Sequence, residues 1–230
     1  MIKQLQMGFK LLKYTHGVVT NIASLILILV MGIWFELVPL FEPGTADLEH
    51  RFIFNLGAYF IMMSALFILQ MLISLNVPNV VAVSPWKKRI QTSVFSIMAL
   101  VTFSITFILM LAIKYYKYIS GISTYTTLVE EIMLLPLATI LTIVYMAVAL
   151  KYFVASTIIF CIMIPGVMSI QAVGPLVGWF NYAGISLGIA IAICVGAIFV
   201  GAALSHGILC LLYKKPVSKY SQVSSLKKKM

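Results

Sequence analysis

Two ionisable residues, Glu36 and His206, fall inside or at the edge of the long apolar stretches of this 230-residue chain. An ionisable side chain is costly to place in hydrocarbon, and such groups often serve transport or catalysis. Glu36, however, lies a few residues from a polar loop and can reach water. His206 can be a neutral imidazole bonded to a neighbouring helix. We therefore interpret both side chains as structural.

Catalytic and metal-binding patterns are missing from the sequence. It contains no GxxxxGK[ST] phosphate-binding loop, no HExxH, no GxSxG, and no cluster of His and carboxylate residues at ligand spacing. Cys161, Cys194 and Cys210 lie in apolar stretches without CxxC spacing, which predicts small, buried, apolar side chains. We expect no catalytic residue, cofactor or metal site in this chain, and no enzymatic activity of its own.

The segment 76–92, NVPNVVAVSPWKKRIQT, is the one substantial internal stretch that is neither long and apolar nor a tight turn. Ser84 can cap a short helix that has Pro85 at its first position. A short amphipathic helix of this kind suits docking into a groove of a partner protein. Its candidate contacts are Ser84, Trp86, Lys87, Lys88, Arg89 and Gln91. Alternatively, the cations only fix the topology and reach lipid headgroups, with Trp86 as an anchor at the membrane interface.

The composition places these residues in a membrane protein, because the chain is 62% hydrophobic and only 10% charged. A soluble protein of this size would have too few charged groups to cover its surface. Six apolar stretches have roughly the 20 residues that a helix needs to cross the hydrocarbon layer. They cover residues 18–40, 52–75, 93–113, 132–150, 152–170 and 185–213. We therefore predict an all-α integral membrane protein with six transmembrane helices.

The two segments that flank this bundle, and one inside it, have patterns of their own. Residues 1–16 predict an amphipathic helix in the plane of the interface, with cations on one face. The apolar face of this helix comprises Ile2, Leu5, Phe9 and Leu12. Residues 214–230 form a basic tail. The uncharged segment 165–184 is rich in Pro, Gly and aromatic residues, which predicts a helix break followed by a re-entrant or interfacial segment.

Charge indicates how the chain is oriented. With six spans, thirteen of the sixteen cations fall on one side, and all six acids fall on or near the other. The positive-inside rule then places both termini in the cytoplasm. These clusters and anionic lipid headgroups account for the net charge of +10, so we expect no nucleic-acid partner. Residues 1–230 form a single transmembrane domain: the interfacial helix 1–16, the bundle 18–213 and the tail 214–230.

This layout resembles the membrane subunit of type-2 ABC exporters. The resemblance covers nearly the whole chain and lies in its architecture: an amphipathic elbow helix at residues 2–13, six spans with both ends cytoplasmic, and a basic loop between spans two and three. A minimal fourth loop at Lys151 and the broken aromatic segment 165–184 complete it. In that family the loop between spans two and three is the coupling helix, which docks on the ATPase subunit. The resemblance implies that residues 84–92 have this role.

The function that the resemblance implies is that of a permease subunit in a bacterial plasma membrane. It would move a hydrophobic or amphipathic cargo, such as a peptide, a lipid or a drug, by alternating access. ATP and Mg²⁺ would bind to a separate cytoplasmic ATPase subunit, and a second membrane subunit, identical or different, would complete the assembly. The alternative is a non-transporting membrane-embedded protein that acts in partner binding, immunity or assembly. An intramembrane enzyme acting on lipid and an ion-coupled carrier are disfavoured, because embedded ionisable residues are scarce.

Overall fold

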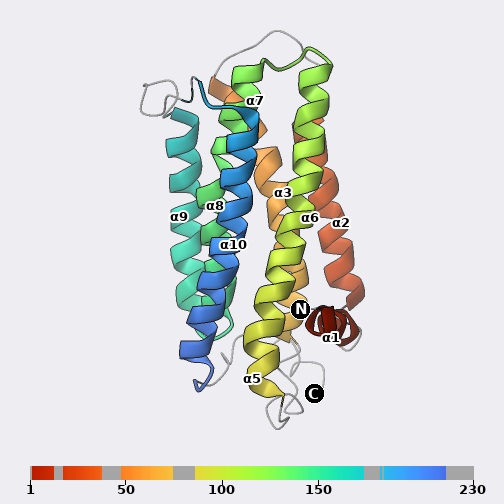
Figure 1. Ribbon diagram of the computed structural model, residues 1–230, viewed down its shortest axis with the longest axis vertical. Coiled ribbons are helices and arrows are strands. Elements are labelled where there is room, and N and C mark those ends of the chain that lie inside the picture. The colour runs from red at the N-terminus through yellow and green to blue at the C-terminus, as the bar shows by residue number, and fades with distance from the viewer. Residues whose placement is uncertain are drawn as a thin grey trace.

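The computed structural model describes residues 2–12, 18–37, 48–74, 86–173, 182 and 184–215. Every regular element in these ranges is helical. Figure 1 shows long helices running side by side along the longest axis, with the short α1 (Ile2–Leu12) lying across their lower end. The prediction of an all-helical protein is therefore confirmed, and so is the helix at the N-terminus.

Four helices of the described residues are long and apolar enough to cross a membrane, judged by length and composition. Their bounds are Val19–Leu37, Lys87–Ile119, Tyr125–Ala149 and Leu187–Leu212. Two further helices, α3 (Leu48–Ser74) and α9 (Phe153–Val173), contain the shorter apolar stretches Leu56–Met71 and Phe153–Val167. These lengths and compositions are those of a membrane protein. Each of the six predicted stretches overlaps one of these helices, and four of the six are long and apolar enough to span.

The remaining elements are α2 (Val18–Leu37), α5 (Lys87–Arg89), the π-helix η2 (Ile90–Val94), α6 (Phe95–Ile119), α7 (Tyr125–Met133), α8 (Leu135–Ala149) and α10 (Leu187–Leu212). Two of the long apolar stretches, 87–119 and 125–149, consist of more than one element. α5, η2 and α6 follow one another without a break, so that they form one continuous rod. A turn at Leu134 separates α7 from α8, which has a proline in its first turn.

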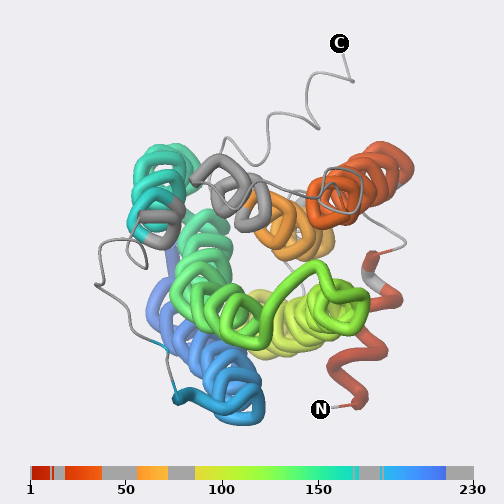
Figure 2. Tube along the Cα trace, turned by 90° about the horizontal axis from the view of Figure 1, so that it is seen from above, coloured from red at the N-terminus to blue at the C-terminus, as the bar shows by residue number. Residues whose placement is uncertain are grey.

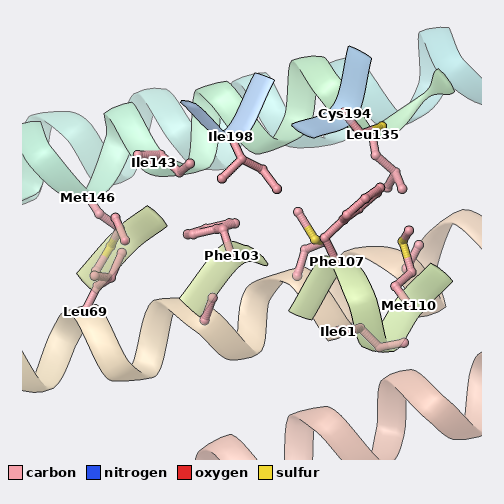
Figure 3. Packing of buried hydrophobic residues seen from close by; sticks show 14 of the residues in the cluster. Ile61, Leu69, Phe103, Phe107, Met110, Leu135, Ile143, Met146, Cys194 and Ile198 are labelled. Atoms are coloured by element: carbon pink, nitrogen blue, oxygen red, sulfur yellow. The ribbon is translucent and has the colours of Figure 1, made fainter. Parts of the chain in front are cut away.

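The interior of the bundle is filled by large apolar side chains from α3, α6, α8 and α10. Figure 3 shows Phe103 and Phe107 of α6 between Ile143 of α8 and Ile198 of α10 on one side and α3 on the other. α8 and α10 approach closely because Gly201 leaves room: a Cβ atom at this glycine would lie 2.9 Å from the Ile143 side chain. Small residues of this kind allow the close van der Waals packing that holds helices together in a membrane.

α2 lies at the edge of the bundle and is packed mainly against α3 (Figure 2). Its outer face is exposed over most of its length. The two helices touch at a pair of glycines: a Cβ at Gly32 would lie 2.8 Å from the Ile61 backbone nitrogen, and one at Gly57 would lie 2.9 Å from the Glu36 backbone nitrogen. This contact brings Glu36 close to the bundle.

Several helix ends differ from the predicted ones. α9 continues through Pro165 to Val173, so the first part of the predicted broken segment 165–184 is helical and the helix passes the predicted end at residue 170. Proline is tolerated inside membrane helices because neighbouring groups and local adjustments satisfy the backbone group that it frees. The rest of the predicted re-entrant segment, 174–181 and 183, lies outside the described residues. The predicted third span, 93–113, belongs to a rod that extends to Ile119.

Candidate functional site

Four charged side chains meet inside the end of the bundle where α2 ends and α7 begins. We call Glu36, Lys114, Lys117 and Glu131 the charge cluster. Lys114 Nζ lies 3.1 Å from Glu36 Oε1 and 2.6 Å from Glu131 Oε2. Lys117 Nζ lies 2.8 Å from Glu36 Oε2 and 3.8 Å from Glu131 Oε2. Glu36 is fully buried, and Lys114 and Lys117 are only 1% and 2% exposed.

Local structure explains how these four side chains come together. Lys114 and Lys117 are three residues apart, so they lie on one face of α6. Gly121, with φ of +74°, follows the end of α6, and a left-handed residue at this place is a common helix terminator. The chain then reverses into α7, which places Glu131 beside α6. Glu36 fits because Gly57 of α3 has no side chain: a Cβ there would lie 2.8 Å from Glu36 Cγ.

The charge cluster is electrically balanced, since it contains two carboxylates and two ammonium groups. Removing one member of a buried ion pair typically costs 3–5 kcal/mol, because the charge left behind is neither paired nor solvated. The cluster therefore ties α2, α6 and α7 together at one end of the molecule. Among the described residues, no group of three or more His, Cys, Asp or Glu side chains is placed to hold a metal ion.

Sequence reasoning identified only one member of this cluster. It considered Glu36 as an embedded group that can reach water, whereas its side chain is buried and paired. Lys114, Lys117 and Glu131 were not singled out. The available signal was the spacing of the two lysines, which follow an apolar stretch directly and lie on the side of the molecule that carries the acids.

The opposite end of the bundle carries the predicted docking segment. Residues 86–89, which we call the basic turn, include α5 and lie at the lower end of Figure 1. Lys88 and Arg89 are exposed, Lys87 is half-buried, and the exposed Trp86 ring lies 5.4 Å from the Arg89 guanidinium carbon. Gln91, by contrast, points inward and is buried. Ser84 lies outside the described residues.

Lys151, at the turn between α8 and α9, connects η2, which directly follows the basic turn, with the end of α10. Its ammonium group donates to Gln91 Oε1 at 3.0 Å and to the Lys215 carbonyl at 2.9 Å, and the residue is 5% exposed. Burial, and secondly the positive charge of Lys87, lower the pKa of Lys151 to about 8. The segment that follows the basic turn is thus joined through Lys151 to the α8–α9 turn and to the end of α10.

The π-helix η2 adds further contacts behind the basic turn. The Thr92 hydroxyl donates to the Lys88 carbonyl at 2.7 Å, and the Ser96 hydroxyl donates to the Thr92 carbonyl at 3.1 Å. Ser205 of α10 in turn donates to the Ser96 hydroxyl at 3.1 Å. Single π-turns inside long helices are frequent at functional sites. Here the π-turn joins the basic turn to the membrane part of α6.

The predicted apolar face of the N-terminal helix is divided in two. Leu5 and Leu12 pack against the bundle, whereas Ile2 and Phe9 are exposed. Between the packed leucines, Gly8 allows the close approach, since a Cβ there would lie 2.6 Å from the Met98 sulfur. α1 is thus attached to α6 and presents its remaining apolar side chains outward, as an interfacial helix does.

His206 and the cysteines have ordinary surroundings. His206 Nε2 lies 3.6 Å from Cys210 Sγ, one helical turn away in α10. Cys194 is buried and donates to the Ile132 carbonyl at 3.1 Å. The prediction that all three cysteines are buried is wrong for Cys161, which is exposed on α9. Apolar neighbours do not distinguish the two cases, because a membrane helix is apolar on all its faces.

The chain matches no protein-family model, no curated protein and no solved structure.

Proposed function

We propose that this protein is the membrane subunit of an ATP-driven exporter of the type-2 ABC kind, with a separate cytoplasmic ATPase docked on the basic turn. One observation carries the proposal: the basic turn is exposed and cationic, and it is continuous with α6. It is also bonded through Gln91 and Lys151 to the α8–α9 turn and to the end of α10. A partner that pulls on this turn therefore displaces several membrane helices together.

The proposed topology has six spans: α2, α3, the α5–α6 rod, the α7–α8 pair, α9 and α10. Both termini lie on the side of the basic turn, in the cytoplasm of a bacterial cell. Two observations support this orientation. Apart from Arg51 of α3, the described cations outside the charge cluster belong to α1, the basic turn, Lys151 and the end of α10, and α1 lies across the same end (Figure 1). Cations concentrate on the cytoplasmic side of membrane proteins.

The proposed mechanism is alternating access. The ATPase binds ATP and Mg²⁺ and changes shape, and the docked basic turn transmits this change to the membrane helices. This chain contributes a different affinity for cargo in each of two states. The apolar interior, rich in Phe and Met, favours a hydrophobic or amphipathic cargo such as a peptide, a lipid or a drug. A second membrane subunit, identical or different, forms the other half of the pathway.

The test is a pull-down of the tagged protein from mild detergent. We expect the wild type to bring an ATPase subunit with it, and a Lys87→Glu/Arg89→Glu variant to lose that subunit. The matched control is Lys3→Glu/Lys10→Glu, which makes the same change of charge on α1, where both lysines are exposed. The control should retain the ATPase. Equal recovery with both variants would remove the basic turn from the interface.

A second candidate function is that of a non-transporting membrane protein that binds a partner within the bilayer. A specific observation favours it: Gly188, Gly196 and Gly207 of α10 have open space where a side chain would be. Small residues at the surface of a membrane helix allow another helix to approach closely. If a Gly196→Leu substitution releases a co-purified membrane protein while no ATPase is recovered with the wild type, this function replaces the exporter.

A further inference from the structure

Among the described residues, the basic-turn end of the molecule has cations but no acidic side chain. The acidic residues of the sequence all lie within 36–49 and 130–131. Glu36 and Glu131 belong to the charge cluster at the opposite end. Besides Lys3 and Lys10 of α1, the described cations of the basic-turn end are Lys87, Lys88, Arg89, Lys151, Lys214 and Lys215. An anionic group of another molecule would balance this charge.

The lack of a negative counter-charge matters most at Lys151, because this lysine is buried. An ammonium group has three N–H donors, and the two acceptors that the described residues offer, Gln91 Oε1 and the Lys215 carbonyl, are both neutral. Its charged neighbour, Lys87, is also positive. A buried charge without a counter-charge is costly, and its field is only weakly screened. The positive charge of Lys151 would therefore stabilise an anion bound at the nearby protein surface.

Further hydrogen-bond donors lie on the segments next to Lys151. Lys215 Nζ lies 2.6 Å from the Tyr152 hydroxyl, and Lys88 Nζ lies 5.0 Å from the centre of the Tyr213 ring. Lys88, Tyr152 and Lys215 are exposed. Ammonium and phenol groups are strong donors to phosphate oxygens. We call the five residues Lys88, Lys151, Tyr152, Tyr213 and Lys215 the headgroup site.

The surroundings of the headgroup site are apolar in one direction only. Exposed Val154 and Ile158 follow Tyr152 along α9, and exposed Leu204 and Leu211 precede Tyr213 along α10. α9 and α10 both pack against α8 and lie on either side of it (Figure 2). Tyrosine and lysine at the end of a span are typical of the headgroup level of a membrane. Hydrocarbon chains would thus meet apolar side chains while the attached anion meets the lysines.

We propose that the headgroup site binds the phosphate group of an anionic phospholipid, whose acyl chains lie along α9 and α10. Basic pockets between membrane helices bind anionic headgroups by this combination of charge and apolar contact. The lipid supplies the negative charge that the chain lacks at this end. It also contacts two elements that Lys151 and Lys215 already join, so it stabilises their arrangement. This inference does not depend on the transport function.

Native mass spectrometry of the protein in neutral detergent tests the proposal. Phosphatidylglycerol and phosphatidylcholine with identical acyl chains serve as probes. We expect the wild type to bind phosphatidylglycerol more tightly, since a lysine near the surface contributes about five-fold to the affinity for an anionic lipid. Lys151→Met and Lys215→Gln should each weaken this binding by about that factor, and neither should change the binding of phosphatidylcholine.

Two controls keep the result specific. Lys3→Gln/Lys10→Gln removes two exposed charges from α1 and should leave the preference intact. If Lys151→Met does not fold, Lys215→Gln/Tyr152→Phe changes only exposed side chains and provides the same test.

Four results would overturn the proposal. One is an unchanged lipid preference in the Lys215→Gln/Tyr152→Phe variant, and another is an equal loss in the α1 control. The third is protection of Lys215 from amine labelling by a co-purified ATPase but not by phosphatidylglycerol. That outcome would make the surface a protein interface instead. If inorganic phosphate displaced the lipid completely at equal concentration, the acyl chains would contribute nothing, and the lipid assignment would likewise fail.

Discussion

Glu36 divides its two carboxylate oxygens between two lysines, Lys114 at 3.1 Å and Lys117 at 2.8 Å. A glutamine at this position keeps the shape of the side chain but removes its charge. Of the two carboxylates in the charge cluster, Glu131 would then remain beside both lysines. The two buried ammonium groups would repel each other, and the contact between α2 and α6 would weaken. The contribution of this residue is thus electrostatic more than steric.

We expect Glu36→Gln to lower the free energy of unfolding by about 3–5 kcal/mol, the usual cost of breaking a buried ion pair. Unfolding with a denaturing detergent, followed by circular dichroism, measures this change. Adding Lys117→Gln restores the balance of one carboxylate with one ammonium group, so the double variant should regain part of the loss. A single variant as stable as the wild type would show that the cluster does not hold α2.

Lys151 makes stability depend on pH in a defined direction. Its pKa is about 8 in the folded protein and 10.5 when the lysine is free in solution, because burial and Lys87 disfavour the charged form. Between these two values the unfolded chain binds more protons than the folded one, so the free energy of unfolding rises with pH. We expect this rise in thermal unfolding at pH 8 to 10.5. It should be smaller in Lys151→Met, and an identical rise in that variant would contradict the assignment.

Among the elements, α2 depends on its close contact with α3, which includes Gly57. Gly57 of α3 is placed so that a Cβ would lie 2.8 Å from Glu36 Cγ and 2.9 Å from its backbone nitrogen. A side chain at this position would separate α2 from α3 and pull Glu36 away from its lysines. The packing of the two helices and the charge cluster are therefore coupled.

We expect Gly57→Ala to destabilise the protein by roughly 1–3 kcal/mol, the usual cost of overpacking a tight contact. The matched control is Gly196→Ala in α10, where a Cβ meets open space. There the substitution should be neutral or stabilising, because alanine favours a helix over glycine by about 1 kcal/mol. Thermal unfolding of both variants in the same detergent provides the comparison. Equal effects would show that Gly57 is not a contact point.

The positions of the helices could be predicted from the sequence, but several of their ends could not. Apolar length is a local property, and it placed all the long helices. Lys114 lies in the part of α6 beyond the predicted end, and it pairs with Glu36, 78 positions away. α9 continues past Pro165 although proline usually kinks or ends a helix. The pairing of Lys114 is a tertiary effect that no local pattern contains.

The candidate sites also divide into features that the local sequence predicts and features that only the fold produces. The basic turn could be predicted, because a run of three cations between apolar stretches is visible locally. The inward position of Gln91 could not, since it depends on Lys151, 60 residues later. The charge cluster was missed for the same reason: its members come from three helices, and only the fold brings them together.

For the whole molecule, the separation of charge determines the orientation that we propose. Ser120 lies in the exposed turn after α6, at the end of the charge cluster, and Lys214 lies past α10 at the opposite end. A membrane-impermeant maleimide should label Ser120→Cys in intact cells, in a background without native cysteines. It should label Lys214→Cys only after the cells are permeabilised. The reverse pattern would place the basic turn outside the cell and exclude a cytoplasmic ATPase.

The pairing of Glu36 also sets an order of events during biosynthesis. The ribosome makes Glu36 long before Lys114 and Lys117, which follow 78 and 81 residues later. At a synthesis rate of about 5–20 residues per second, roughly 4–16 s pass between them. During that interval α2 carries a carboxylate whose lysine partners do not yet exist. The ion pairs that hold Glu36 form only after α6 has been made, so α2 is synthesised early but completes its contacts late.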